Sequence, residues 1–227
     1  MDTLEKYYLN KLYPFQDEVL KFIQTGNTNF YLTGGTVLSR CFLHHRYSDD
    51  LDFFVNADPD FKEQTRQIID GLKKESMWTI EIGTASDSFV RLILEKNTTL
   101  LKIDFVNDVK FHKGSLEKHS LFHRIDNWSN ILSNKLCAIS RLDVKDIVDI
   151  LFISKNHKFD WKEIIKDARE KDLWADPLEI CKILKQFPTE LLNTIKWISP
   201  VNIEVLIKAI GSIHDDIFFG HENSLCP

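Results

Sequence analysis

The stretch FYLTGGTVLSRCFLHHRYSDDLDFFV, residues 30–55, decides the fold. It begins with a β-prone run that ends at the pair Gly34-Gly35, and Thr36 then stands where it can cap a helix of apolar periodicity. From Asp50 to Val55 polar and apolar residues alternate, which is typical of a strand with one buried face. The stretch therefore predicts a strand, a glycine turn, a helix and a second strand in succession.

The segments on either side continue this pattern of helices and strands. Residues 4–23 carry apolar side chains at helical spacing, and Asp58-Pro59 supplies an N-cap and a first-turn proline for another helix. Three β-prone runs follow at residues 78–82, 89–94 and 100–106. Together these segments predict a mixed β-sheet flanked by helices.

The pattern changes in the C-terminal half, where the apolar periodicity is helical from residue 115 onward. The expected helices cover residues 129–142, 144–153, 161–169, 177–187 and 203–218. We therefore expect an α+β fold in which residues 1–110 form the sheet domain and residues 111–227 form a helical C-terminal domain.

The composition of the 227 residues narrows the class of protein. Hydrophobic residues make up 43% and charged residues 28%, which is too apolar for a disordered chain. The four cysteines stand singly, and no stretch is long and uncharged enough to span a bilayer. We therefore expect a cytoplasmic protein that has neither disulfides nor a membrane partner.

The net charge of −5 means that any polyanionic partner must meet a local basic patch. One candidate is residues 110–124, where four cations and three histidines stand against the single acid Glu117. These basic residues are Lys110, Lys113, Lys118, Arg124, His112, His119 and His123. The patch favours an RNA partner, and a solvated loop or helix face is the alternative interpretation of such a charge run.

Three aspartates suggest the chemistry. Asp50 and Asp52 are separated by one residue on a predicted strand, so their carboxylates share a face and suit a hard cation such as Mg²⁺ or Mn²⁺. Asp104 alternates with apolar residues on a later strand and joins the pair if the two strands are neighbours. Three carboxylates can hold two ions about 3.5–4 Å apart, the arrangement used in nucleotidyl transfer.

The glycine turn supplies the other half of the expected site. Gly34 and Gly35 let the backbone approach a phosphate, and the amides at the start of the next helix favour an anion. Thr36 can add a hydroxyl contact. A Gly-Gly turn alone is a weak signal, and a single Asp-x-Asp is often a solvent-facing strand end. The hypothesis of a nucleotidyl-transfer site therefore depends on finding the glycine turn, the short helix, the acid pair and the later strand acid in this order.

Two blocks of residues resemble the AbiEii/AbiGii-type toxins of the DNA polymerase β-like nucleotidyltransferase superfamily. The first is the glycine turn followed by an Arg-x-Ser-x-Asp-x-Asp stretch, with Arg46, Ser48, Asp50 and Asp52 on its positions. The second, residues 135–150, resembles the family's Lys-Leu-x-Ala, Arg and Arg/Lys-Asp-x-x-Asp-Leu signature, with Ile150 at the position of the leucine. The resemblance covers most of residues 30–155.

The resemblance implies a nucleotidyltransferase-like fold and specific roles. Arg46 and Ser48 would help the glycine turn to bind the nucleotide, and Lys135 would contact the triphosphate. Asp146 would complete the site from the helical side. Spaced ion pairs on helix surfaces are the alternative account of this second block.

The resemblance further implies a Mg²⁺-dependent transfer of a nucleotide from an NTP, with Mn²⁺ as a possible substitute, by the toxin of a toxin–antitoxin pair. The acceptor would be RNA, at the tRNA 3′ end, and the cognate antitoxin would be a protein partner. A protein or small-molecule acceptor stays open, because one metal site serves any hydroxyl, and so does an inactive module that binds nucleotide or RNA. A further alternative is a zinc or nuclease site, whose candidate ligands would be His44, His45, His119 and His123.

Overall fold

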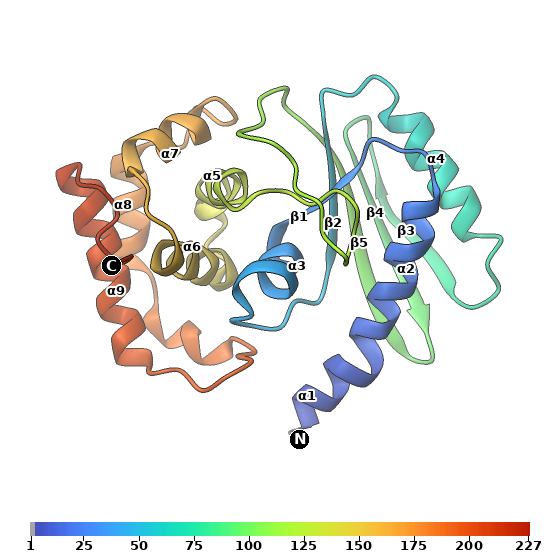
Figure 1. The fold of residues 1–227 in the computed structure, drawn as a ribbon, viewed down its shortest axis with the longest axis horizontal. Coiled ribbons are helices and arrows are strands. Elements are labelled where there is room, and N and C mark those ends of the chain that lie inside the picture. Colours follow the sequence, from blue (N-terminus) through green and yellow to red (C-terminus); the bar gives the residue numbers. More distant parts are fainter. Residues whose placement is uncertain (1–2) are drawn as a thin grey trace. The chain divides into compact units, whose positions relative to one another are not determined.

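The computed structural model describes residues 3–227, and residues 1 and 2 of the expected first domain lie outside them. The chain divides into two compact units (Figure 1). The first comprises Met1–Cys41 and Tyr47–Asn127, and the second comprises Phe42–Arg46 and Trp128–Pro227. We expected a single boundary near residue 110, whereas the chain enters the second unit briefly at residues 42–46 and again at residue 128.

The first unit contains a five-stranded mixed sheet, as the sequence predicted. Its elements are α1 (Thr3–Tyr7), η1 (Tyr8–Leu12), α2 (Tyr13–Thr25), β1 (Tyr31–Thr33), α3 (Gly34–Val37), the start of η2 (Leu38–Leu43), β2 (Leu51–Asn56), α4 (Phe61–Leu72), β3 (Thr79–Ala85), β4 (Phe89–Lys96) and β5 (Thr99–Asp108). The strand order is β1-β2-β5-β4-β3. Within residues 3–227, β2 and β5 run parallel and the other strand pairs are antiparallel.

One face of this sheet forms the core of the first unit. Alternate residues of β2 and β5, among them Phe53 and Phe105, are fully buried, and these two rings stack with their centroids 5.3 Å apart. Phe30 contacts Phe105 and also Phe61 at the start of α4. In Figure 1, α2 and α4 run along the sheet. The strict alternation sends the intervening polar residues of β2 and β5 to the opposite face.

The second unit is helical, which confirms the class expected for this half of the chain. Its elements are the end of η2, α5 (Trp128–Ala138), η3 (Ile139–Arg141), α6 (Val144–Asn156), α7 (Trp161–Arg169), α8 (Pro177–Gln186), η4 (Thr189–Thr194) and α9 (Ile203–Phe219). Asp143, Asp160, Asp176 and Asn202 each cap a helix through a side-chain oxygen. These caps explain why the predicted helix starts lie within two residues of the observed ones.

Two local predictions about helix starts are wrong. No helix is present at residues 115–127, where the side chain of Asn127 instead donates to the carbonyls of Lys113 and Ser115. Asp58 does not occupy the N-cap of α4, which is Asp60 without a side-chain cap bond. The Asp58 carboxylate instead accepts hydrogen bonds from Asn29 and from the Asp60 amide.

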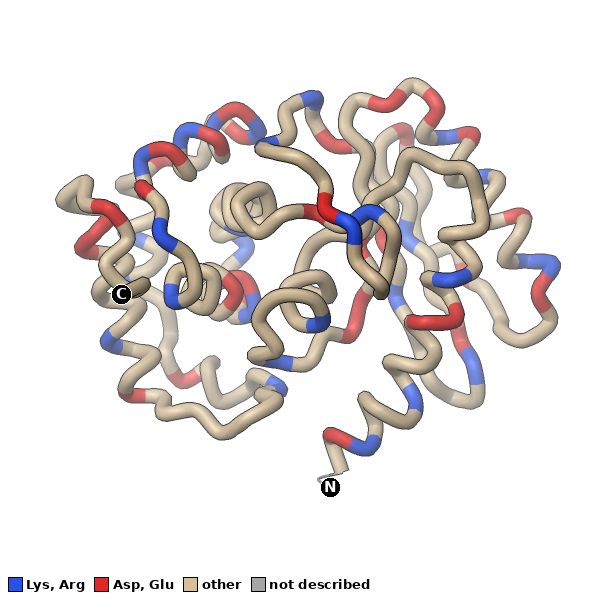
Figure 2. Tube along the Cα trace, viewed as in Figure 1, with Lys and Arg blue, Asp and Glu red and all other residues tan. Residues whose placement is uncertain are grey.

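The expected basic patch at residues 110–124 is only partly a surface feature. His112 bonds Asp126, His119 bonds Cys41, and the Arg124 guanidinium donates to the carbonyl of Thr28. Burial lowers the pKa of Arg124. Lys110 and Lys118 remain exposed. Figure 2 shows basic and acidic residues interspersed along the chain, and none of the described helices is long and apolar enough to cross a membrane.

Candidate active site

The three predicted carboxylates share one face of the sheet in the first unit. Asp52 on β2 lies directly opposite Asp104 on the parallel neighbour β5, and Asp50 precedes β2 by one residue. This is the arrangement that the sequence predicted if the strands were neighbours. We call Asp50, Asp52 and Asp104 the acidic row.

Two cations that the sequence reasoning missed hold the acidic row. Arg91 on β4 binds Asp104 through two hydrogen bonds, Nε to Oδ1 at 2.8 Å and Nη2 to Oδ2 at 2.7 Å. Lys102 on β5 places Nζ 2.9 Å from Asp50 Oδ2 and 3.8 Å from Asp104 Oδ2. The row is therefore a set of acids already matched by cations, whose side chains stay partly exposed at 40% for Arg91 and 33% for Lys102.

The electrostatics of both cations tie the acidic row together. Burial alone would lower the pKa of Lys102, but its bond to Asp50 and the charges of all three aspartates raise that pKa. The pKa of Arg91 is raised chiefly by its hydrogen bonds to Asp104, with smaller effects from Asp50 and Asp52. Because both cations respond to the same three carboxylates, these charges form one coupled group.

The glycine turn lies against the acidic row. Gly34 has a φ of +72°, and a Cβ built on it would lie 2.6 Å from Asp52 Oδ2. Only glycine adopts this conformation readily while also leaving space for the carboxylate. The Asp52 carboxylate therefore packs directly on the backbone of the turn.

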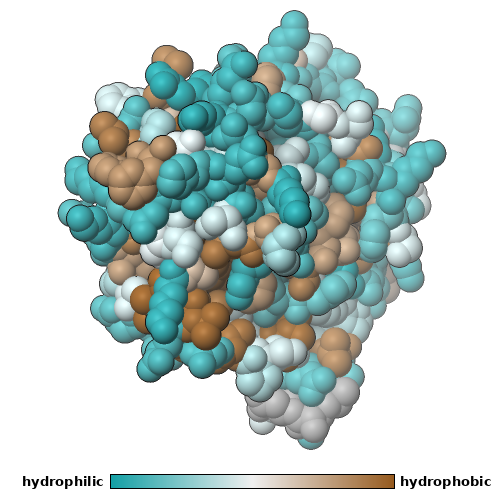
Figure 3. All heavy atoms as spheres, turned by 60° about the vertical axis from the view of Figure 1, so that its left-hand side comes forward, coloured by the Kyte–Doolittle hydropathy of each residue, from teal (hydrophilic) through white to brown (hydrophobic). Residues whose placement is uncertain are grey.

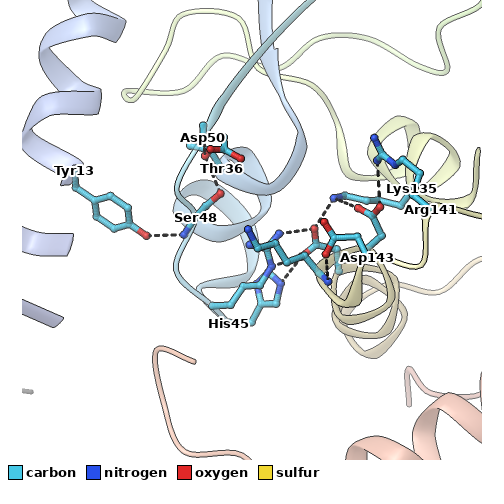
Figure 4. A network of polar contacts seen from close by, with 12 residues as sticks. Tyr13, Thr36, His45, Ser48, Asp50, Lys135, Arg141 and Asp143 are labelled. Carbon is cyan, nitrogen blue, oxygen red and sulfur yellow. Dashed lines mark hydrogen bonds and ion pairs between the residues drawn. The ribbon is translucent and has the colours of Figure 1, made fainter. Parts of the chain in front are cut away.

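Thr36 and Ser48 lie next to the backbone of Asp50 and are hydrogen-bonded to each other. The Thr36 hydroxyl donates to the Asp50 carbonyl and lies 3.0 Å from the Ser48 hydroxyl, and both residues are buried (Figure 4). The prediction that Thr36 caps the helix is wrong, because α3 begins at Gly34 after Thr33. The Thr36 hydroxyl is therefore bonded to the Asp50 backbone, and contact of Thr36 or Ser48 with a phosphate stays a prediction.

A second charged group lies within the helical unit. Arg46 binds Asp149 on α6 through two hydrogen bonds, Nε to Oδ1 at 2.8 Å and Nη2 to Oδ2 at 2.7 Å. His45 Nε2 lies 2.9 Å from the same Oδ1. The Asp149 side chain is 0% exposed and that of Arg46 is 3% exposed, so the guanidinium is enclosed by this pairing. Direct phosphate binding by Arg46 is therefore not supported by its place in the structure.

Lys135 on α5 extends this group. Its Nζ lies 2.6 Å from Asp146 Oδ1 and 2.8 Å from Asp149 Oδ2, and Arg141 Nη2 lies 3.1 Å from Asp146 Oδ2 (Figure 4). The pairs of Lys135 with Asp146 and Asp149 are thus buried between facing helices, whereas the side chain of Arg141 is 68% exposed. We call His45, Arg46, Lys135, Asp146 and Asp149 the buried network.

Burial and charge pull in opposite directions within the buried network. Burial alone would raise the pKa of Asp149, but the charges of Arg46 and Lys135 hold it well below its ordinary value. Burial would lower the pKa of Lys135, and Asp149 and Asp146 raise it. The pKa of His45 is lowered, because burial outweighs its bond to Asp149. The network therefore holds charged lysine, arginine and aspartate with a neutral histidine.

The missed residues had recognisable signals. Asn97 and Thr98 both have positive φ at the β4–β5 turn, which is typical of a two-residue hairpin loop. Counting outward from such a turn pairs Arg91 with Asp104, as observed. Lys102 stands two residues before Asp104 and so shares its face. Asp149 is the second aspartate of the Asp-x-x-Asp signature, which did not indicate that it pairs with Arg46 and Lys135.

Magnesium fits the acidic row through two ligands completed by a substrate. Mg²⁺ usually takes one or two protein carboxylates together with substrate phosphates, and Asp50 and Asp52 supply such oxygens beside the glycine turn. Asp104 is engaged through both oxygens by Arg91. Among residues 3–227 no three His, Cys, Asp or Glu side chains gather closely enough to hold a metal alone. Metal binding by all three carboxylates therefore stays a prediction, and the four-histidine zinc hypothesis gains no support.

Comparison with known proteins gives one family and one fold. A family model described as the nucleotidyl transferase AbiEii toxin of a type IV toxin–antitoxin system matches residues 22–199. A putative nucleotidyltransferase from Helicobacter pylori shares 18% identity at a TM-score of 0.62, covering 92% of this chain and 96% of that one. JHP933 from the same organism shares 20% identity at a TM-score of 0.56, covering 91% of this chain and 92% of that one.

A third similar structure is MenT4, a nucleotidyltransferase toxin from Mycobacterium tuberculosis. It shares 14% identity at a TM-score of 0.59, covering 91% of this chain and 82% of that one. At these identities the solved structures establish the fold alone. No curated protein sequence matches the chain closely enough for comparison.

Proposed function

The chain belongs to the AbiEii nucleotidyl transferase toxin family, and from that membership we propose that its acidic row transfers a nucleotide from an NTP to a hydroxyl of RNA. The expected acceptor is the 3′ end of tRNA, and the protein acts as the toxin beside a cognate antitoxin. The family establishes a toxin nucleotidyltransferase. The metal, the acceptor and the residues that act are the proposal.

One observation carries the proposal. Asp52 faces Asp104 across the parallel strands β2 and β5, and its carboxylate lies against the Gly34 backbone. A triphosphate seated on the glycine turn would therefore lie beside two acids of the row. This juxtaposition of phosphate-binding backbone with metal-binding oxygens is what nucleotidyl transfer requires.

Each of these residues has a proposed role in the transfer reaction. The acceptor oxygen attacks the α-phosphorus, the new oxygen–phosphorus bond forms, and the bond to the departing pyrophosphate breaks. Bound Mg²⁺, held by Asp50 and Asp52, would neutralise charge on the phosphate oxygens. Asp104, whose two oxygens are held by Arg91, would help to orient or deprotonate the attacking hydroxyl through the lone pairs that the guanidinium leaves free. Thr36 holds the Asp50 backbone in place.

The choice of RNA as acceptor has narrower support. It comes from the family resemblance and from Lys110 and Lys118, which stay exposed in the segment after β5. A protein or small-molecule hydroxyl would use the same acidic row. The family resemblance is the ground for proposing that Lys135 and Asp146 take part in the reaction. Because their ion pairs are buried, we also propose that they stabilise the helical unit.

The test is to incubate the protein with each α-labelled NTP in turn, Mg²⁺ and total tRNA. We expect label in RNA, and we expect Asp50→Ala or Asp52→Ala to reduce it by at least about 100-fold, the scale of losing a key transition-state contact. Thermal melting should show both variants folded. Asp70→Ala, which removes an exposed acid of α4, is the matched control and should retain activity.

Each part of the proposal has its own contrary result. Label that appears only in protein bands would refute the RNA acceptor and leave the acidic row intact. Undiminished RNA labelling by folded Asp50→Ala and Asp52→Ala would refute the acidic row. Full activity after exhaustive removal of divalent ions by chelation would refute the metal.

A further inference from the structure

The helical unit carries an apolar groove that the proposed reaction does not use. Its volume is about 820 Å³, and it lies among α7, the segment before α8, and the end of α9. Trp161, Ile165 and Ile217 contribute buried side chains to it. The rim includes Leu173 and Phe219, which are 81% and 64% exposed. Figure 3 shows apolar side chains gathered in patches on the face that contains these helices.

One wall of the groove is cationic. Lys162, Lys166 and Arg169 recur at i, i+4 and i+7 along α7, so they form one stripe. At 1.5 Å of rise per residue the stripe spans about 10 Å, or two helical turns. None of these three side chains makes an ion pair with any residue that the structure describes.

Lys162 differs from Lys166 and Arg169 in its surroundings. The stem of Lys162 packs on Gly220, where an added Cβ would lie 3.0 Å from its Cε, so its charge stands at the C-terminal end of α9 and favours the helix dipole. Lys166 and Arg169 are exposed. Their charges are therefore available to a ligand that enters the groove.

We propose that this groove binds an amphipathic helix of a partner protein, with apolar residues facing the groove and acidic residues along one flank. A helix laid in a groove uses anchors at i, i+3 or i+4 and i+7, and acids at that spacing match the stripe on α7. Leu173, Phe218 and Phe219 would cover the apolar anchors. The inference is independent of the proposed function, because no residue of the acidic row or buried network lines the groove.

The charge pattern favours a protein helix over single-stranded RNA. Exposed Glu163 and Glu170 share α7 and its end with the cations, and Figure 2 shows acids and bases alternating there. A phosphate backbone gains affinity by meeting several cations in sequence, and here it would also meet these acids. Glu163 lies outside the groove, whereas Glu170 lines it. A helix with charge on only one flank can meet Lys166 and Arg169 if it places a polar or basic residue beside Glu170.

The test uses the full chain and a display library of helix-forming peptides about 20 residues long, enough for about five turns. We expect enrichment of acidic amphipathic sequences. Lys166→Glu/Arg169→Glu should weaken the best synthetic peptide by about tenfold or more, since two attractive charges become repulsive. Phe218→Ala/Phe219→Ala should weaken it as well. Lys21→Glu/Lys74→Glu, the same charge change on exposed lysines of the first unit, should leave its affinity unchanged.

Four results would overturn the inference. The first is a selection that enriches no peptide, or that enriches basic peptides. The second is peptide binding that is unchanged in both groove variants when thermal melting shows that they are folded. The third is tighter binding of a labelled oligouridylate than of any acidic peptide, with the same sensitivity to Lys166→Glu/Arg169→Glu. The fourth is a dimer of this chain that the same variant dissociates, which would assign the groove to a second copy.

Discussion

The acidic row and the buried network use the same chemical groups in opposite settings. In the acidic row, Lys102 and Asp50 are 33% and 31% exposed at the side chain, so water can replace either partner. In the buried network, Asp149 is fully enclosed and Arg46 nearly so. A partly exposed pair contributes little to stability and can exchange partners, whereas a buried pair is costly to break. Partly exposed charges suit a site that binds and releases ions, and buried charges suit ion pairs that stabilise the fold.

The largest test of this contrast is Asp149→Ala. Removing the carboxylate leaves Arg46 and Lys135 buried without their shared partner, and we expect the free energy of unfolding to fall by about 3–5 kcal/mol. Urea denaturation measures the change. Asp50→Ala, made in the partly exposed row, should shift the same quantity by less than about 1 kcal/mol. Equal losses in the two variants would remove the distinction between the regions.

Gly34→Ala probes the backbone of the row. An alanine at a φ of +72° costs about 1–2 kcal/mol in conformation, and its Cβ must displace the Asp52 carboxylate. We expect a loss of stability of that size and a larger proportional loss of nucleotidyl transfer. Gly211→Ala is the matched control, because nothing lies within 4 Å of its Cβ position in α9. That change should stabilise the protein slightly, and an inactive Gly211→Ala would show that the assay reports stability alone.

Lys102→Met tests whether the row exchanges its cations. Loss of the ammonium beside Asp50 should raise the affinity for Mn²⁺ or Mg²⁺ by up to about tenfold, which corresponds to about 1.4 kcal/mol. Stability should change by less than about 1 kcal/mol. Titration calorimetry measures the affinity. Lys96→Met, which breaks a pair with Glu18 elsewhere on the sheet, should not alter it. Unchanged metal affinity in Lys102→Met would mean that Lys102 does not compete for the carboxylate.

The smallest effect concerns His45 in the buried network. Its pKa is lowered by burial, so the unfolded chain binds a proton that the folded chain resists. The stability from neutral His45 is therefore full above about pH 6.5 and is lost as pH falls toward the folded pKa, with a slope of at most about 1.4 kcal/mol per pH unit. Thermal melting from about pH 7 to pH 5 should show a shallower decline for His45→Gln than for the parent chain. Identical slopes would contradict the assignment.

Much of the acidic row was predictable because strand periodicity is local. Alternation over residues 50–55 and 101–105 was enough to put Asp50, Asp52 and Asp104 on polar faces. The parallel pairing of β2 with β5 then brought the faces together, and that pairing depends on packing between residues about 50 positions apart in the sequence. The fold class and the C-terminal helices followed similarly from periodicity and capping residues.

The buried network could not be derived in the same way. A lysine, an arginine and two aspartates at helical spacing also describe an ordinary solvated surface, and only tertiary contacts show which side chains are enclosed. The same limit applied to residues 110–124, where His112 and His119 turned inward to Asp126 and Cys41. Charge composition predicted an exposed segment there, but hydrogen bonds to residues 14 and 78 positions away turn these two histidines inward.

The brief entry of residues 42–46 into the helical unit has a consequence for synthesis. Arg46 and Asp149 are 103 positions apart, so a ribosome adding about 5–20 residues per second makes the arginine roughly 5–20 s before its partner. Throughout that interval the bond between Arg46 and Asp149 cannot form. A polypeptide terminated before residue 149 cannot enclose His45 and Arg46, so completion of the helical unit requires translation of both distant segments.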